Sequence, residues 1–148
     1  MEREWLVDRA TCPSCQTLNP AMPLSCDSFI SWAARVLPAS APTGVLAYNF
    51  NIAEATAGFE LEVIGSSSFD RENSDWVCEE AWTSRPHKYV VAYAEAGRDW
   101  EPFLAWAATA VRKFIESELP GADTLKKAHA VAVGFVDGEL VIVAGRDV

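Results

Sequence analysis

The sequence predicts a single α+β domain: a mostly antiparallel sheet of about five strands, covered by one long helix in the C-terminal half and by a short N-terminal helix. The chain has 148 residues, of which 50% are hydrophobic and 22% are charged, as in one ordinary globular domain. Apolar and polar residues alternate along residues 45–52, 59–64 and 88–94, which is the period of half-buried strands. Apolar residues recur at helical spacing over residues 99–119. Strands combined with a separate long helix favour the α+β class.

Residues 1–27 predict an irregular arm ahead of a domain of residues 28–148. Regular structure is disfavoured because prolines interrupt the arm at positions 13, 20 and 23. The arm carries Cys12-Pro-Ser-Cys15, the thiol spacing with which a zinc knuckle begins, and Cys26 follows. A complete site needs four ligands, and the other possible ones are distant in sequence: Cys78, His87 and His129. We therefore predict no cofactor and keep a small zinc-stabilised adaptor as an alternative.

A short amphipathic helix is expected over residues 28–37. Its apolar residues follow helical spacing, Asp27 or Ser28 can cap its N-terminus, and Pro38 ends it. Residues 38–43 contain two prolines and small side chains, so they are predicted to link the helix to the sheet.

The strands at residues 45–52 and 59–64 are predicted to pair as an antiparallel hairpin, because only residues 53–58 connect them. One face of this pair is apolar and is expected to point to the core. The other face is expected to be exposed and to carry Asn49, Asn51, Glu60 and Glu62.

After these strands, a polar loop is predicted to lead into a helical turn over residues 74–82. The turn carries Trp76, Glu79, Glu80 and Trp82. Because the two tryptophans are six residues apart, they cannot both point inward equally on one helix, which leaves one of them as a surface anchor. Residues 88–94 then form a third strand.

The long helix is predicted over residues 99–119. Asp99 is its N-cap, Pro102 is tolerated in its first turn, and Pro120-Gly121 ends it. Trp106 falls outside the apolar stripe and is expected at its margin or on the far side.

A second hairpin is predicted at the C-terminal end of the domain. Its strands are the apolar runs at residues 130–136 and 139–143, and Asp137-Gly138 between them is a strong two-residue turn signal. These strands complete the predicted sheet.

Negative charge is concentrated between Glu54 and Glu80. This stretch holds eight acidic side chains and one basic one, Arg71, and so carries −7 of the chain's net charge of −9. Such a field speeds the approach of a basic surface, whereas nucleic acid requires a basic footprint that this chain lacks. We therefore predict a basic protein partner and no nucleic acid. The predicted partner-binding residues are the carboxylates and tryptophans Glu60, Glu62, Asp70, Glu72, Asp75, Trp76, Glu79, Glu80 and Trp82.

Catalysis is the less favoured interpretation, and we expect no enzyme. The sequence contains neither a Gly-x-Ser-x-Gly elbow nor a glycine-rich phosphate loop. Glu60 and Glu62, with Asp75, Glu79 or Glu80, could hold a divalent metal or supply an acid and a base. A carboxylate-dependent metal hydrolase is therefore an alternative, although no lysine occurs near these acids in the sequence segment.

No apolar run of signal-peptide or membrane-span length occurs in the sequence. We therefore expect a cytoplasmic protein without membrane contact, in which the four cysteines are reduced thiols or metal ligands. The sequence leaves open whether the protein is a monomer or a homodimer.

Two stretches resemble small acidic bacterial immunity proteins of polymorphic or type VI secretion toxins. These are residues 65–80, Gly-Ser-Ser-Ser-Phe-Asp-Arg-Glu-Asn-Ser-Asp-Trp-Val-Cys-Glu-Glu, and residues 133–140, Val-Gly-Phe-Val-Asp-Gly-Glu-Leu. The resemblance spans about residues 45–144. It implies a cytoplasmic, non-enzymatic inhibitor that binds one cognate toxin and covers its active site or substrate entry.

Overall fold

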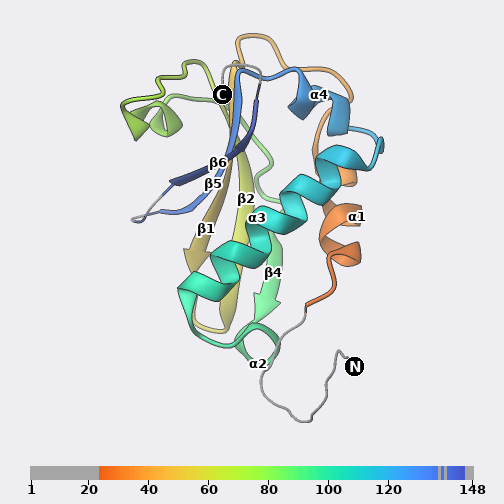
Figure 1. Ribbon diagram of the computed structural model, residues 1–148, viewed down its shortest axis with the longest axis vertical. Coiled ribbons are helices and arrows are strands. Elements are labelled where there is room, and N and C mark those ends of the chain that lie inside the picture. Colours follow the sequence, from red (N-terminus) through yellow and green to blue (C-terminus); the bar gives the residue numbers. More distant parts are fainter. Residues whose placement is uncertain (1–23, 137, 139, 146–148) are drawn as a thin grey trace.

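The computed structural model describes residues 24–136, 138 and 140–145 (Figure 1). Within them, one sheet is formed by six strands: β1 Ala47–Glu54, β2 Gly58–Ser66, β3 Glu80–Thr83, β4 Tyr89–Ala92, β5 Ala130–Phe135 and β6 Leu140–Ala144. The helices are α1 Asp27–Val36, the 3-10 helix η1 Ser74–Cys78, α2 Tyr93–Ala96, α3 Trp100–Glu116 and α4 Ala122–Lys126. The predicted arm at residues 1–23, with Cys12 and Cys15, lies outside the described residues.

The strand order is β3-β2-β1-β5-β6, and β4 also pairs with β2. β3 and β4 lie at different registers along β2, with β3 opposite residues 64–66 and β4 opposite residues 58–61. β1 and β5 are parallel, and every other pair is antiparallel. The predicted α+β class with a mostly antiparallel sheet is confirmed. The sheet has one strand more than expected because residues 80–83 form β3 and not the end of a helical turn.

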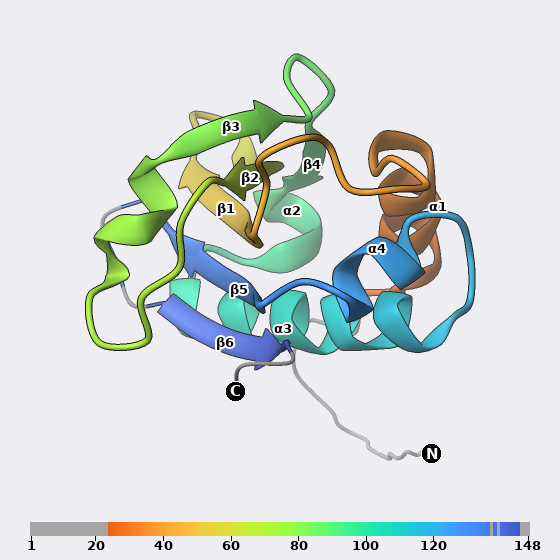
Figure 2. The ribbon, with the colours of Figure 1, turned by 90° about the horizontal axis from the view of Figure 1, so that it is seen from above.

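Helices α3, α1 and α4 pack together on one side of the sheet (Figures 1 and 2). The core between them contains aromatic rings from all layers, including Phe29 of α1, Phe50 of β1, Phe59 of β2 and Phe103 of α3, each with none of its surface exposed. Burial of these side chains is the main favourable term in the stability of the fold, at about 25 cal/mol per Å² of apolar surface.

Trp106, which was expected at the margin of the apolar stripe of α3 or on its far side, is buried. Only 9% of its surface is exposed, and its ring lies against Phe29 and Phe103. Its indole Nε1 donates a hydrogen bond to the carbonyl oxygen of Leu24 at 3.2 Å. The apolar stripe facing the sheet is thus only one of the two buried sides of α3, because α1 and the residues before it cover a second side. Leu24 and Cys26 pack against this core, so the last residues of the predicted arm belong to the domain.

The helix ends lie close to their predicted positions. α1 begins one residue earlier than expected, with Cys26 as its N-cap, and ends before Pro38. α3 ends at Glu116. The sequence analysis missed two short helices: α2 begins at Tyr93, inside the predicted third strand, and α4 follows Gly121, whose φ of 92° is a left-handed conformation that suits glycine. None of the helices in the described part of the chain is long and apolar enough to span a membrane.

Tyr48 is expected to make the fold sensitive to alkali. Its side chain is 1% exposed, and its hydroxyl has no hydrogen-bond partner among the described residues. Burial raises the pKa of Tyr48 from 10.0 to about 12. The unfolded state loses this proton more readily than the folded state. The free energy of unfolding is therefore unaffected by this group below pH 10 and falls between pH 10 and pH 12, by at most about 3 kcal/mol at about 1.4 kcal/mol per pKa unit.

This prediction is checked by urea unfolding of the wild type and Tyr48→Phe on both sides of that pH range. The substitution keeps the ring and removes a hydroxyl that has no partner among the described residues, so near neutral pH the two proteins should differ by less than about 1 kcal/mol. In alkali, the wild type should lose more stability than Tyr48→Phe. Equal losses would show that the Tyr48 hydroxyl is not responsible.

Candidate partner-binding surface

Residues 67–79, here called the acidic loop, connect β2 to β3 and include η1. Two local hydrogen bonds shape it: Asp70 Oδ1 accepts from the Glu72 N–H at 2.9 Å, and Asn73 Oδ1 accepts from the Asp75 N–H at 3.0 Å. Both are turns of the kind that Asp and Asn form with backbone two residues on. The loop closes where the Ser67 N–H donates to the carbonyl oxygen of Glu79 at 2.9 Å.

The acidic loop covers part of the sheet face that was predicted to be exposed. Trp76 is 3% exposed and forms a second apolar cluster with the small strand residues Ala47, Ala130 and Ala132. Half-buried side chains of the loop and of β6 extend this cluster, namely Phe69, Val77, Leu140 and Ile142. Figure 2 shows the loop on the side of the sheet away from α1 and α4.

Asn49 is therefore not the exposed residue that strand alternation predicted. It is 2% exposed, and Asn51 beside it is half-buried. The alternation itself is correct, because Tyr48, Phe50 and Ile52 share the opposite, core-facing side. The prediction failed because the acidic loop, which is distant from β1 in the sequence, covers the polar side of β1.

The two tryptophans of the predicted site lie on different elements. Trp76 is on η1 and buried, whereas Trp82 is on β3, half-buried, with its ring 6.4 Å from that of Tyr48. Gly65 lies opposite both Tyr48 and Trp82 in the sheet and places no side chain between them. The prediction that both tryptophans lie on one helix, with one of them exposed as an anchor, is therefore wrong. Both rings pack against the sheet.

The carboxylates of the predicted site fall into two groups. Glu60, Glu62 and Glu80 lie on the sheet and form ion pairs with two bases that follow them in the sequence. Arg85 donates to Glu62 at 2.8 Å and to Glu80 at 3.0 Å, and Lys88 lies 3.3 Å from Glu60. The hydrogen bonds to Glu62 and then Glu80 raise the pKa of Arg85 above its usual value. The sequence analysis missed both bases: the segment itself contains no lysine, but the fold brings Lys88 from outside the segment to Glu60.

The second group comprises the four carboxylates of the acidic loop, Asp70, Glu72, Asp75 and Glu79, all of which are exposed. Three of them line a shallow hollow of about 220 Å³ together with Ser68, Asn73 and Trp76. The structure thus brings these acids together on one short, ordered segment. The ion-paired acids lie instead on the flanking strands β2 and β3.

The described residues give little basis for a metal centre. They contain no group of three or more His, Cys, Asp or Glu side chains that could hold a metal ion. Cys26 is half-buried at the start of α1, and Cys78 is exposed on η1. Neither alternative, the zinc-stabilised adaptor or the carboxylate-dependent hydrolase, gains a site from this part of the chain.

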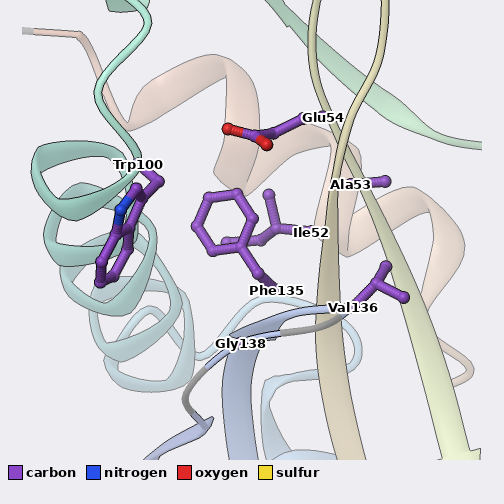
Figure 3. A pocket seen from close by; sticks show the side chains of 7 residues that line it. All are labelled: Ile52, Ala53, Glu54, Trp100, Phe135, Val136 and Gly138. Atoms are coloured by element: carbon purple, nitrogen blue, oxygen red, sulfur yellow. The ribbon is translucent and has the colours of Figure 1, made fainter.

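A second and larger hollow, here called the strand-end pocket, lies at the other end of β1. Its volume is about 530 Å³, and it is lined by Ile52, Ala53, Glu54, Trp100, Phe135, Val136 and Gly138. Since β1 spans eight residues, this pocket is about 23 Å from the strand end beside the acidic loop. Figure 3 shows Trp100 of α3 facing Phe135 of β5, with Ile52 behind Phe135 and the Glu54 carboxylate above them. The sequence analysis missed this pocket.

No family model matches the chain, and no significant similarity to a curated protein or to a solved structure is found.

Proposed function

We propose that this chain is a non-enzymatic binding protein that captures a basic protein partner through the acidic loop. The observation that carries the proposal is the exposure of four carboxylates, Asp70, Glu72, Asp75 and Glu79, on one ordered segment. The loop also contains Arg71, so its formal net charge is −3, and the next bases in the sequence, Arg85 and Lys88, pair with acids of the sheet. A field of one sign on a fixed surface accelerates encounter with an oppositely charged partner and rejects like-charged ones.

The narrower form of the proposal is an immunity protein whose partner is a cognate toxin. It is supported by the resemblance of residues 65–80 and 133–140 to small acidic immunity proteins. An inhibitor of this kind needs a shaped and charged surface but no catalytic group. Burial of the loop's own Trp76 against the sheet suits such a surface, because it fixes the backbone that presents the carboxylates.

The test begins with capture of a partner from lysate of the source organism and continues with association kinetics on the purified pair. The loop variant combines Asp70→Asn, Glu72→Gln, Asp75→Asn and Glu79→Gln, which removes four charges. The amide oxygen introduced at position 70 can still accept the hydrogen bond from the Glu72 N–H, so the turn is kept. At low salt, the association rate of this variant should be at least about tenfold below that of the wild type, and moderate salt should narrow the difference.

The matched control removes the same number of charges from exposed positions outside the loop, by Glu95→Gln, Glu101→Gln, Glu116→Gln and Glu118→Gln. Its association rate should stay within about threefold of the wild type, because these charges lie away from the proposed surface. If both variants slow association equally, overall charge and not the loop steers the partner. If neither does, the acidic loop is not the binding surface.

A further inference from the structure

The strand-end pocket combines three features of a small-molecule site. Its volume of about 530 Å³ falls within the range of about 300–1,000 Å³ that ligand pockets occupy. β1 and β5 are parallel, so their carboxyl ends open at the same edge of the sheet, which is the edge at which ligands bind in open parallel α/β sheets. The first turn of α3 forms the opposite wall through Trp100.

The apolar walls of this pocket are aromatic and only partly covered. Trp100 leaves 45% of its surface exposed, although it lies in a helix whose other large apolar residues are mostly buried. Its ring meets that of Phe135 edge to face, with 6.1 Å between the centroids. Ile52, which is fully buried, supports Phe135 from behind (Figure 3). A partly exposed tryptophan ring is a good surface for stacking or for a cation.

Among the described residues, those with charged side chains that line the pocket or its adjoining hollow are acidic: Glu54, Asp99 and Glu101. In Figure 3 the Glu54 carboxylate is directed toward the α3 side, above the Phe135 ring, whereas Ala53 and Val136 point the other way. Asp99 and Glu101 flank Trp100 and line an adjoining hollow, and the Asp99 side chain makes no capping hydrogen bond to α3. These two acids offset the partial positive charge of the helix N-terminus. The neighbouring Arg98 stacks on Tyr93 at 4.4 Å.

We infer that the strand-end pocket binds a small organic cation with an aromatic body. The aromatic part packs against Trp100 and Phe135, and the ammonium group lies within reach of Glu54. This site is independent of the acidic loop, which lies at the other end of β1, so the inference does not rest on the proposed function.

The test uses probes that share a phenylethyl or benzyl body and differ in charge: phenethylammonium, 2-phenylethanol and phenylacetate. Each is titrated into the intact protein and followed by NMR shifts of backbone amides and of the Trp100 indole. Phenethylammonium should bind about five- to tenfold more tightly than 2-phenylethanol, and phenylacetate should bind most weakly. N-acetyl-lysine amide, which carries the ammonium on an aliphatic chain, should bind more weakly than phenethylammonium.

Three variants assign the effect to the pocket. Glu54→Gln should remove most of the preference for phenethylammonium over 2-phenylethanol, whereas Glu95→Gln, an exposed acid outside the pocket, should leave it unchanged. Trp100→Leu should weaken the ammonium and the alcohol alike, with an unaltered circular dichroism spectrum. Equal binding of all three charge forms, or of N-acetyl-lysine amide and phenethylammonium, would overturn the inference. So would shifts confined to residues outside the pocket.

Discussion

Trp76→Ala is expected to lower the free energy of unfolding by about 3–5 kcal/mol, the usual loss when a buried tryptophan is truncated in a core. Trp76 is 3% exposed and is the largest member of the cluster that attaches the acidic loop to the sheet. Its ring also meets Phe69 edge to face at 5.3 Å. Urea unfolding followed by circular dichroism measures the loss.

Trp100→Ala is the matched control, because it removes the same side chain from a site that is 45% exposed. It should cost about 1 kcal/mol, and equal losses at the two sites would contradict the assignment of Trp76 to a core. A variant that combines substitution of Trp76 with substitution of Glu79 and Glu80 would disturb the structure of the loop itself. The binding surface is therefore better tested by substituting its carboxylates alone.

Local patterns were sufficient to predict much of the fold. The hairpin of β1 and β2, the long helix α3 and the apolar runs that became β5 and β6 follow from the spacing of apolar residues and from turn and cap residues. These patterns depend only on neighbours in sequence. The parallel pairing of β1 with β5 does not, because it joins residues more than 80 positions apart and leaves no local signal.

The covered second face of the sheet shows a different limit of sequence reasoning. A period of two says which residues share a side of a strand but not what lies against that side. A signal did exist in the small residues Ala47, Ala130 and Ala132, which allow a bulky ring such as Trp76 to approach the strands closely. These three alanines, considered together with Trp76, would have predicted that a segment packs over this end of the sheet.

The candidate site was predicted in composition but only partly in arrangement. Counting charges between Glu54 and Glu80 ended five residues before Arg85, whose guanidinium pairs with Glu62 and Glu80 across neighbouring strands. Linear charge density therefore overstated the field on the sheet. It remained a fair description of the acidic loop, whose exposed carboxylates follow one another on a single segment.

Phe59→Ala is expected to be the other most damaging substitution, with a loss of about 3–5 kcal/mol. Phe59 has none of its surface exposed and is stacked on Phe103 of α3, with ring centroids 4.2 Å apart. It also meets Tyr93 at 5.1 Å and Phe135 at 5.8 Å, both edge to face. Aromatic pairs contribute beyond the area they bury, so three such contacts place this ring among the most stabilising of the core.

The same ring supports the strand-end pocket, because Phe135 lies between Phe59 and Trp100. Phe59→Ala should therefore also weaken phenethylammonium binding in the protein that remains folded, although Phe59 itself does not line the pocket. Phe59→Leu keeps most of the volume and should cost less than about 2 kcal/mol, with binding nearly unchanged. Unfolding curves and NMR titrations of both variants measure the two effects. Retained affinity in Phe59→Ala would show that Phe135 holds its position through Ile52 and the strand backbone alone.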